Sequence, residues 1–160
     1  MRQLLQTLFQ YQTWATDDLL SLLGRQGSLL SMDDMNASLR ILNHCWVVEQ
    51  IFQANLQGLP HGRDALNTPE TPSLETLQTR LQASAAWYQH YLQTLDTAAW
   101  QERLDFLFVD GKAGNMQRSE MLMHLLTHGN YHRGMVGRIL AAAGIQPPKD
   151  SLTAFLHATP

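Results

Sequence analysis

The sequence predicts an all-α protein, a four-helix bundle with a short hairpin between helices 3 and 4. Four long segments repeat apolar residues at the i, i+3, i+4 spacing of an amphipathic helix. Glycine and proline separate these segments. The length of 160 residues, 44% of them hydrophobic, suits one domain with a core of its own. We therefore expect a single domain over residues 1–160.

The first two helices are expected over residues 2–23 and 34–57. Gly24 and Gly27 are expected to end the first helix, and Asp33 or Asp34 to cap the second. The first helix carries one apolar stripe, formed by Leu4, Leu5, Leu8, Tyr11, Ala15, Leu19 and Leu22.

A crossover loop is expected over residues 59–69, since the second helix should stop at Gly58 and Pro60. The third helix is expected to open at Thr71-Pro72, a cap followed by proline in the first turn, and to reach about Leu95.

The last third of the chain predicts a hairpin, a long helix and a short tail. Residues 104–109 are rich in β-forming side chains and precede the turn signal Asp110-Gly111. The fourth helix is expected over residues 118–143, where Gly144 with an apolar follower is a typical end. The tail, residues 150–160, predicts at most a short turn.

Charge and cysteine content exclude several classes of protein. The formal net charge is −3 and no basic run is present, whereas nucleic-acid binding needs a clustered cationic face. No segment approaches the length of a membrane span, and no signal peptide is recognisable. One cysteine, Cys45, allows no internal disulfide. We expect a cytoplasmic protein without nucleic-acid or membrane partners.

Histidine placement suggests a metal site. His124, His128 and His132 follow one another at i, i+4 and i+8 in the fourth helix, so neighbouring rings share a face. His44 lies mid-way along the second helix, where a neutral imidazole needs a hydrogen-bond partner or a metal. Three histidines from two facing helices, with a water in the fourth position, are the layout of an open catalytic zinc site, and imidazole also suits nickel and iron. The blander alternatives are a satisfied core His44 and a surface coincidence on the fourth helix.

The sequence lacks the motifs that other kinds of catalytic site require. No glutamate follows His124 or His128, which argues against a zincin-type protease. The chain has no Glu-x-x-His motif of a di-iron bundle, and no Ser/His/Asp or phosphate-binding glycine pattern. Cys45 points about 100° away from His44 on a helix, so a buried thiol is expected there rather than a ligand. The three remaining histidines are expected in solvated or loop positions: His61, His90 and His157.

Four segments resemble the DinB/YfiT-like family of proposed metalloenzymes. The most specific is His-Leu-Leu-Thr-His-Gly-Asn-Tyr-His-Arg-Gly at residues 124–134, which is similar to the family's helix-four signature. Tyr11-x-x-Trp14-Ala15, residues 42–49 with His44 and Glu49, and residues 144–150 agree in order and spacing.

The resemblance implies a left-handed four-helix bundle, usually a homodimer, with a divalent metal near one end. The family's ligand positions carry over onto His44, His128 and His132. His124 matches a further histidine, for which we expect packing or support of a ligand, and Glu49 is a second candidate for such support. Two departures are Tyr131, where another histidine is frequent, and Met135, where glutamine often follows.

Two functions of different classes follow. The first is a metal-dependent thiol S-transferase or small-molecule hydrolase, with a three-histidine site activating a bound water or thiol. Its metal would be nickel, zinc or iron, with a low-molecular-weight thiol as one co-substrate. Trp14, Trp46 and Tyr131 would line its cleft, although core packing is the alternative for both tryptophans. The second is a non-catalytic, dimerising stress-response protein that binds metal. A helical interaction module with incidental histidines is a third reading.

Overall fold

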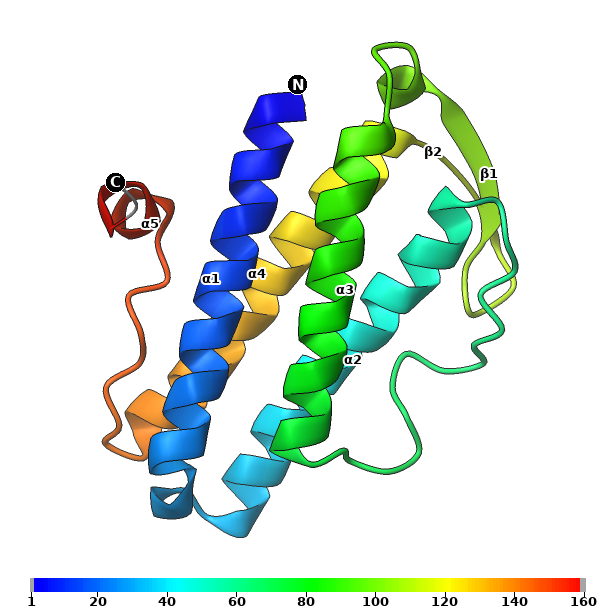
Figure 1. The fold of residues 1–160 in the computed structure, drawn as a ribbon. Coiled ribbons are helices and arrows are strands. Elements are labelled where there is room, and N and C mark those ends of the chain that lie inside the picture. Colours follow the sequence, from blue (N-terminus) through cyan, green and yellow to red (C-terminus); the bar gives the residue numbers. More distant parts are fainter. Residues whose placement is uncertain (1, 159–160) are drawn as a thin grey trace.

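Five α-helices and a two-stranded antiparallel sheet make up the part of the chain that the computed structural model describes, residues 2–158 (Figure 1). The helices are α1 (Arg2–Gln26), α2 (Met32–Leu56), α3 (Leu74–Thr94), α4 (Arg118–Ala142) and α5 (Leu152–Ala158). The strands are β1 (Arg103–Leu107) and β2 (Ala113–Gln117), and two 3-10 helices span Gly27–Leu29 and Ala99–Gln101. The predictions of a mostly helical protein and of a hairpin before the last long helix are confirmed.

The four long helices lie side by side, and the apolar face of each is covered by two others (Figure 1). Helix α1 packs against α3 and α4, and α2 packs against the same two. Two buried clusters result, one that includes Phe9, Val47 and Tyr88, and one that includes Leu20 and Leu42. No helix among residues 2–158 is long and apolar enough to cross a membrane.

The start of α2 and the end of α1 differ from the sequence prediction. Ser31, not Asp33 or Asp34, caps α2, because its Oγ accepts the Asp34 N–H at 3.1 Å. The two aspartates instead lie in the first turn, where negative charge favours the helix dipole. Helix α1 also continues through Gly24 to Gln26, since one glycine costs only about 1 kcal/mol in a packed helix.

A serine cap sets the start of α3, and a glycine sets the end of α4. Ser73 caps α3 by accepting the Thr76 N–H at 3.2 Å, so the predicted start at Thr71-Pro72 is wrong. Helix α4 ends as predicted at Gly144, whose φ of 76° is a left-handed conformation. The buried Ile145 follows and donates its N–H to the Leu140 carbonyl at 2.9 Å.

The hairpin covers one end of the helices through Phe106. Its strands pair antiparallel, with Phe106 opposite Gly114. A Cβ at Gly114 would lie 2.5 Å from the Phe106 ring, so only glycine lets that ring cross the sheet. Phe106 is 8% exposed and packs on Phe52 of α2, with ring centroids 6.1 Å apart. The hairpin is therefore fixed to the helix that also carries His44.

The tail forms a helix where the sequence predicts only a turn. Helix α5 lies outside α1 (Figure 1), and its Phe155 is buried against Tyr11 and Trp14, with centroids 6.0 and 5.8 Å away. This contact with α1 is remote in sequence, which explains why local patterns did not reveal the helix.

Candidate metal centre

Three histidines from two helices meet at one point. His44 lies on α2, and His128 and His132 lie one turn apart on α4. Because α2 and α4 pack against each other, the histidine face of α4 meets His44. One ring nitrogen from each histidine lies within 4.8 Å of the other two, and all three side chains are half-buried.

The ring geometry suits a shared ion. His44 Nε2 and His128 Nε2 are 3.0 Å apart, and the His132 ring centroid lies 4.7 Å from His44 and 4.4 Å from His128. Nitrogens that bind one tetrahedral zinc at about 2.0–2.1 Å lie roughly 3.3 Å apart. His132 Nδ1 is buried and has no hydrogen-bond partner among the described residues. An unsatisfied polar atom within a cluster of three histidines fits a site that binds a metal ion.

Burial favours the neutral forms of His128 and His132. It lowers the pKa of His128 to about 3, and the neighbouring His132, His44 and His124 lower it further in that order. Burial, followed by the proximity of His44, also lowers the pKa of His132. A neutral imidazole is the form that binds a metal ion. His128 and His132 therefore present lone pairs, not positive charges, at neutral pH.

A backbone carbonyl sets the tautomer of His44. Its Nδ1 donates to the carbonyl oxygen of Leu66 at 2.7 Å. The proton on Nδ1 leaves Nε2, the nitrogen next to His128, with its lone pair free. Leu66 lies in the crossover loop between α2 and α3, which the sequence did not connect with the histidines.

Asn43 holds that loop in place. It is fully buried, and its Nδ2 donates to Asn67 Oδ1 and, at 2.7 Å, to Thr68 Oγ1. Arg40 adds a second connection, since its Nη1 donates to the Thr68 carbonyl at 2.6 Å. The residue beside His44 in the sequence thus positions the segment that orients His44. A buried asparagine next to a candidate ligand was the available sequence signal.

We expect Asn43→Ala to weaken both the fold and the metal site. Loss of a buried amide with two partners should lower the free energy of unfolding by about 1–3 kcal/mol. Release of the Leu66 carbonyl should lower zinc affinity by about tenfold or more. Asn36→Ala, an exposed position on the same helix, is the matched control. Denaturant unfolding and competition with a chromophoric chelator measure the two effects, and unchanged zinc affinity in Asn43→Ala would contradict the role of the loop.

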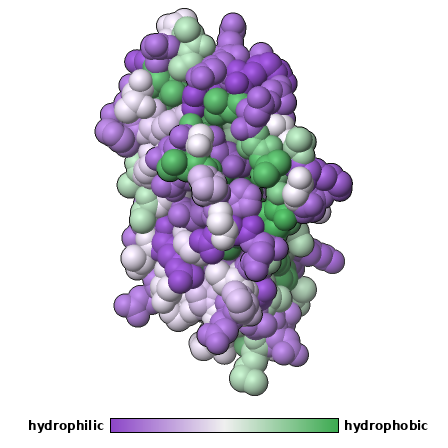
Figure 2. All heavy atoms as spheres, turned by 90° about the vertical axis from the view of Figure 1, so that its right-hand side faces the viewer, coloured by the Kyte–Doolittle hydropathy of each residue, from purple (hydrophilic) through white to green (hydrophobic). Residues whose placement is uncertain are grey.

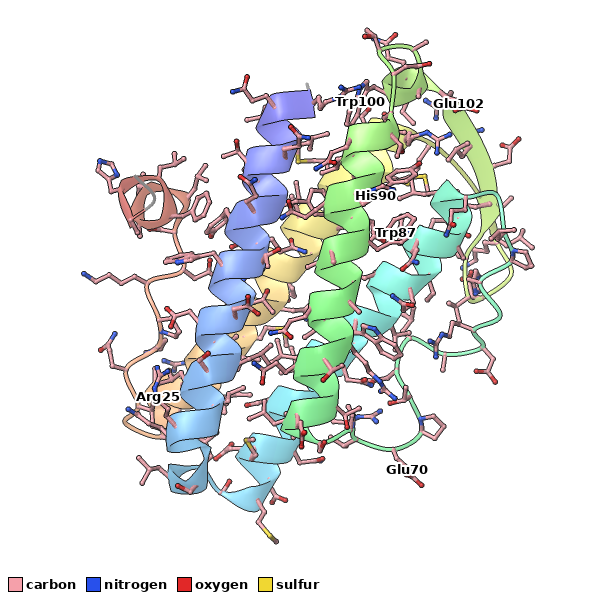
Figure 3. All side chains as sticks on the ribbon, viewed as in Figure 1. Arg25, Glu70, Trp87, His90, Trp100 and Glu102 are labelled. Carbon is pink, nitrogen blue, oxygen red and sulfur yellow. The ribbon has the colours of Figure 1, made fainter. Side chains whose placement is uncertain are left out.

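The other histidines lie outside the cluster. His124 is exposed and stacks on Phe52, with centroids 5.0 Å apart, so it packs beside His128. His61 lies in the crossover loop and His157 on α5. His90 lies near Trp87 on α3 (Figure 3), and this helix contributes no residue to the cluster.

Of the three aromatic residues predicted to line the cleft, two pack elsewhere and one lies beside the histidine cluster. Trp14 packs on Tyr11 and on the tail. Trp46 packs against both core clusters, and the guanidinium groups of Arg63 and Arg80 lie over its ring. Tyr131, 68% exposed, is the one that reaches the cluster, 5.1 Å from the His132 ring. Cys45 is buried, which raises the pKa of its thiol well above the usual range. It is absent from the group of candidate ligands.

Glu49 is not a partner of the candidate ligands. Its carboxylate accepts hydrogen bonds from Gln12 Nε2 at 3.3 Å and Ser84 Oγ at 2.5 Å, and no bond joins it to a histidine within residues 2–158. Burial raises the pKa of Glu49 to about 7, although Ser84, Arg133 and Gln12 oppose the shift. Among residues 2–158, Glu49 therefore gives no candidate ligand a hydrogen bond.

Two further segments that carry the family resemblance meet in a structural contact. The Tyr11 hydroxyl of α1 donates to Asp150 Oδ1 of the tail. Arg133, which follows His132, forms a buried ion pair with Asp150 at 2.7 Å. These residues connect α1, α4 and the tail, so their pattern reports the fold rather than the chemistry of the histidines.

Comparison with known proteins identifies a family for this chain. No curated protein and no solved structure matches this sequence at a significant level. The model of the DinB family matches residues 1–160, the whole chain. Together with the convergence of its signature histidines, this match shows that the chain belongs to the DinB family.

Proposed function

We propose that this protein is a divalent-metal-dependent enzyme, acting as a thiol S-transferase or a small-molecule hydrolase. The observation that carries the proposal is the convergence of three imidazoles, from His44, His128 and His132, with one ring nitrogen of each within 4.8 Å of the others. Three uncharged ligands leave the full positive charge of a bound nickel, zinc or iron ion available to acidify or polarise a substrate group.

The chain's own residues would supply orientation and access. The Leu66 carbonyl holds His44 in the binding tautomer, and burial keeps His128 unprotonated. The half-buried cluster and the exposed Tyr131 beside it allow a small molecule to approach. A low-molecular-weight thiol co-substrate, a homodimer, a cytoplasmic location and the left-handed four-helix bundle belong to the proposal through the family resemblance.

A non-catalytic metal-binding role in a dimerising stress-response protein is the second candidate. Its supporting observation is that the cluster joins α2 to α4, so a bound ion would link two helices that are distant in sequence. Metal binding then contributes to the free energy of folding without turnover.

The deciding measurement is metal content by mass spectrometry, on protein without a purification tag. After incubation with nickel, zinc or iron, we expect about one ion per chain in the parent. The double variant His128→Ala, His132→Ala should hold almost none. His90→Ala removes an exposed imidazole on α3 and should bind like the parent. Equal metal content in the parent and the double variant would refute the site.

The metal-loaded parent and the double variant should then be compared for thiol transfer and for ester or amide hydrolysis. Turnover that depends on the histidines supports the enzyme. One ion per chain without turnover on any of these substrates favours the structural role.

A further inference from the structure

A cleft of about 410 Å³ lies between the start of the crossover loop and strand β1. Its apolar walls include Leu59, Phe106 and Leu107. The three clustered histidines are not among its lining residues, so it is separate from the candidate metal centre. The side of the molecule that carries the crossover loop and the hairpin shows apolar patches among hydrophilic residues in its upper half (Figure 2). The volume is in the range of small-molecule sites.

An unpartnered amide lines this cleft. Asn55, at the end of α2, is only 5% exposed. Its Nδ2 is buried and has no hydrogen-bond partner among the described residues. Most buried amides are paired, because desolvating one without compensation is unfavourable. An unpaired amide beside a cleft is explained if a ligand provides its partner.

The other polar groups of the cleft favour a ligand that accepts hydrogen bonds. Arg63 has no carboxylate partner among residues 2–158, and its guanidinium lies over the Trp46 ring at 5.1 Å. His61 Nδ1 accepts the Arg63 backbone N–H at 3.0 Å, so Nε2 is the ring nitrogen that carries a proton to donate. Asp105, the acidic lining residue, is exposed and already accepts from Asn115 Nδ2 at 2.5 Å.

We propose that this cleft binds a small carboxylate with a compact apolar body. The guanidinium of Arg63 would pair with the carboxylate, His61 and Asn55 would donate hydrogen bonds, and Leu59, Phe106 and Leu107 would contact the apolar part. The cation–π contact with Trp46 holds the Arg63 head group in place before binding. This inference does not depend on the metal site, since no clustered histidine takes part.

The test is a chemical-shift titration of ¹⁵N-labelled full-length protein, stripped of metal with a chelator. The probes are 3-phenylpropionate, its neutral amide, and 3-phenylpropylamine, each up to about 10 mM, which detects dissociation constants in the millimolar range. We expect the acid to shift resonances of residues 55–63 and 105–107. The amide and the amine should bind about tenfold more weakly.

Two arginines provide a matched pair of variants. Arg63→Gln should weaken binding of the acid about tenfold. Arg80→Gln removes the other cation over the Trp46 ring, 4.4 Å from its centroid, but not a lining residue, and should bind the acid like the parent.

Asn55→Leu separates binding from folding. Because the buried Nδ2 of Asn55 has no partner among the described residues, a leucine of similar shape should leave the melting temperature equal or higher, yet weaken binding of the acid. The proposal is overturned if the acid shifts no resonance, if the amine binds as well as the acid, or if Arg63→Gln binds normally. Shifts confined to His44, His128 and His132 would also overturn it. All these results are obtained without metal, so they leave the metal proposal to its own test.

Discussion

Zinc is expected to raise the melting temperature of the parent protein by about 5–10 °C at a free concentration near 100 times its dissociation constant. Such saturation stabilises the folded state by about 2.7 kcal/mol. In a domain of this size, 1 kcal/mol corresponds to about 2–4 °C. The gain arises because the unfolded chain separates His44 from His128 and His132, while the folded chain holds their nitrogens within 4.8 Å.

Variants locate this stabilisation. His44→Ala, which leaves the α4 pair intact, should lose most of the shift, and the double variant His128→Ala, His132→Ala should lose all of it. His90→Ala should keep the full shift, because this exposed residue lies on another helix. Differential scanning fluorimetry with and without a chelator measures the effect. A shift of equal size in the double variant would place zinc elsewhere and contradict the three-histidine site.

Glu49→Gln is expected to stabilise the protein at about pH 8 by roughly 3 kcal/mol. Burial raises the pKa of Glu49 to about 7 from an ordinary value near 4.5. The folded state therefore binds this proton more tightly than the unfolded state, and the stability it contributes is complete below about pH 4.5. It is lost as the pH rises to about 7. Each pKa unit corresponds to about 1.4 kcal/mol, and glutamine is never charged.

The difference between the two proteins isolates Glu49 from the histidines. The lowered pKa of His128 acts with the opposite sign, since its contribution to stability is lost as the pH falls below the ordinary value near 6.5. Urea unfolding at several pH values should show similar stabilities at about pH 4 and a difference that grows up to about pH 7. Glu70→Gln, which removes an exposed carboxyl between α2 and α3 (Figure 3), is the matched control. A constant difference across this range would refute the raised pKa.

Local patterns in the sequence determined most of the secondary structure. The apolar spacing of the four long segments, Gly144 and the Asp110-Gly111 turn act within a few residues, so they can be read without the fold. The i, i+4 spacing of His128 and His132 is also local, and it places both rings on one face of any helix. Caps were harder to place, because Ser31 and the two aspartates that follow are all good capping residues.

Only the tertiary structure decided what each of these faces contacts. It brought His44 to the histidines of α4, placed the Leu66 carbonyl on His44 Nδ1, and buried the Glu49 carboxylate against Gln12 and Ser84. These contacts join residues that are 22 or more positions apart. They depend on how the helices pack and on the path of the crossover loop. Periodicity determines that a helix has a buried face, while packing determines which groups meet there, and the tautomer of His44 and the pKa of Glu49 follow from those neighbours.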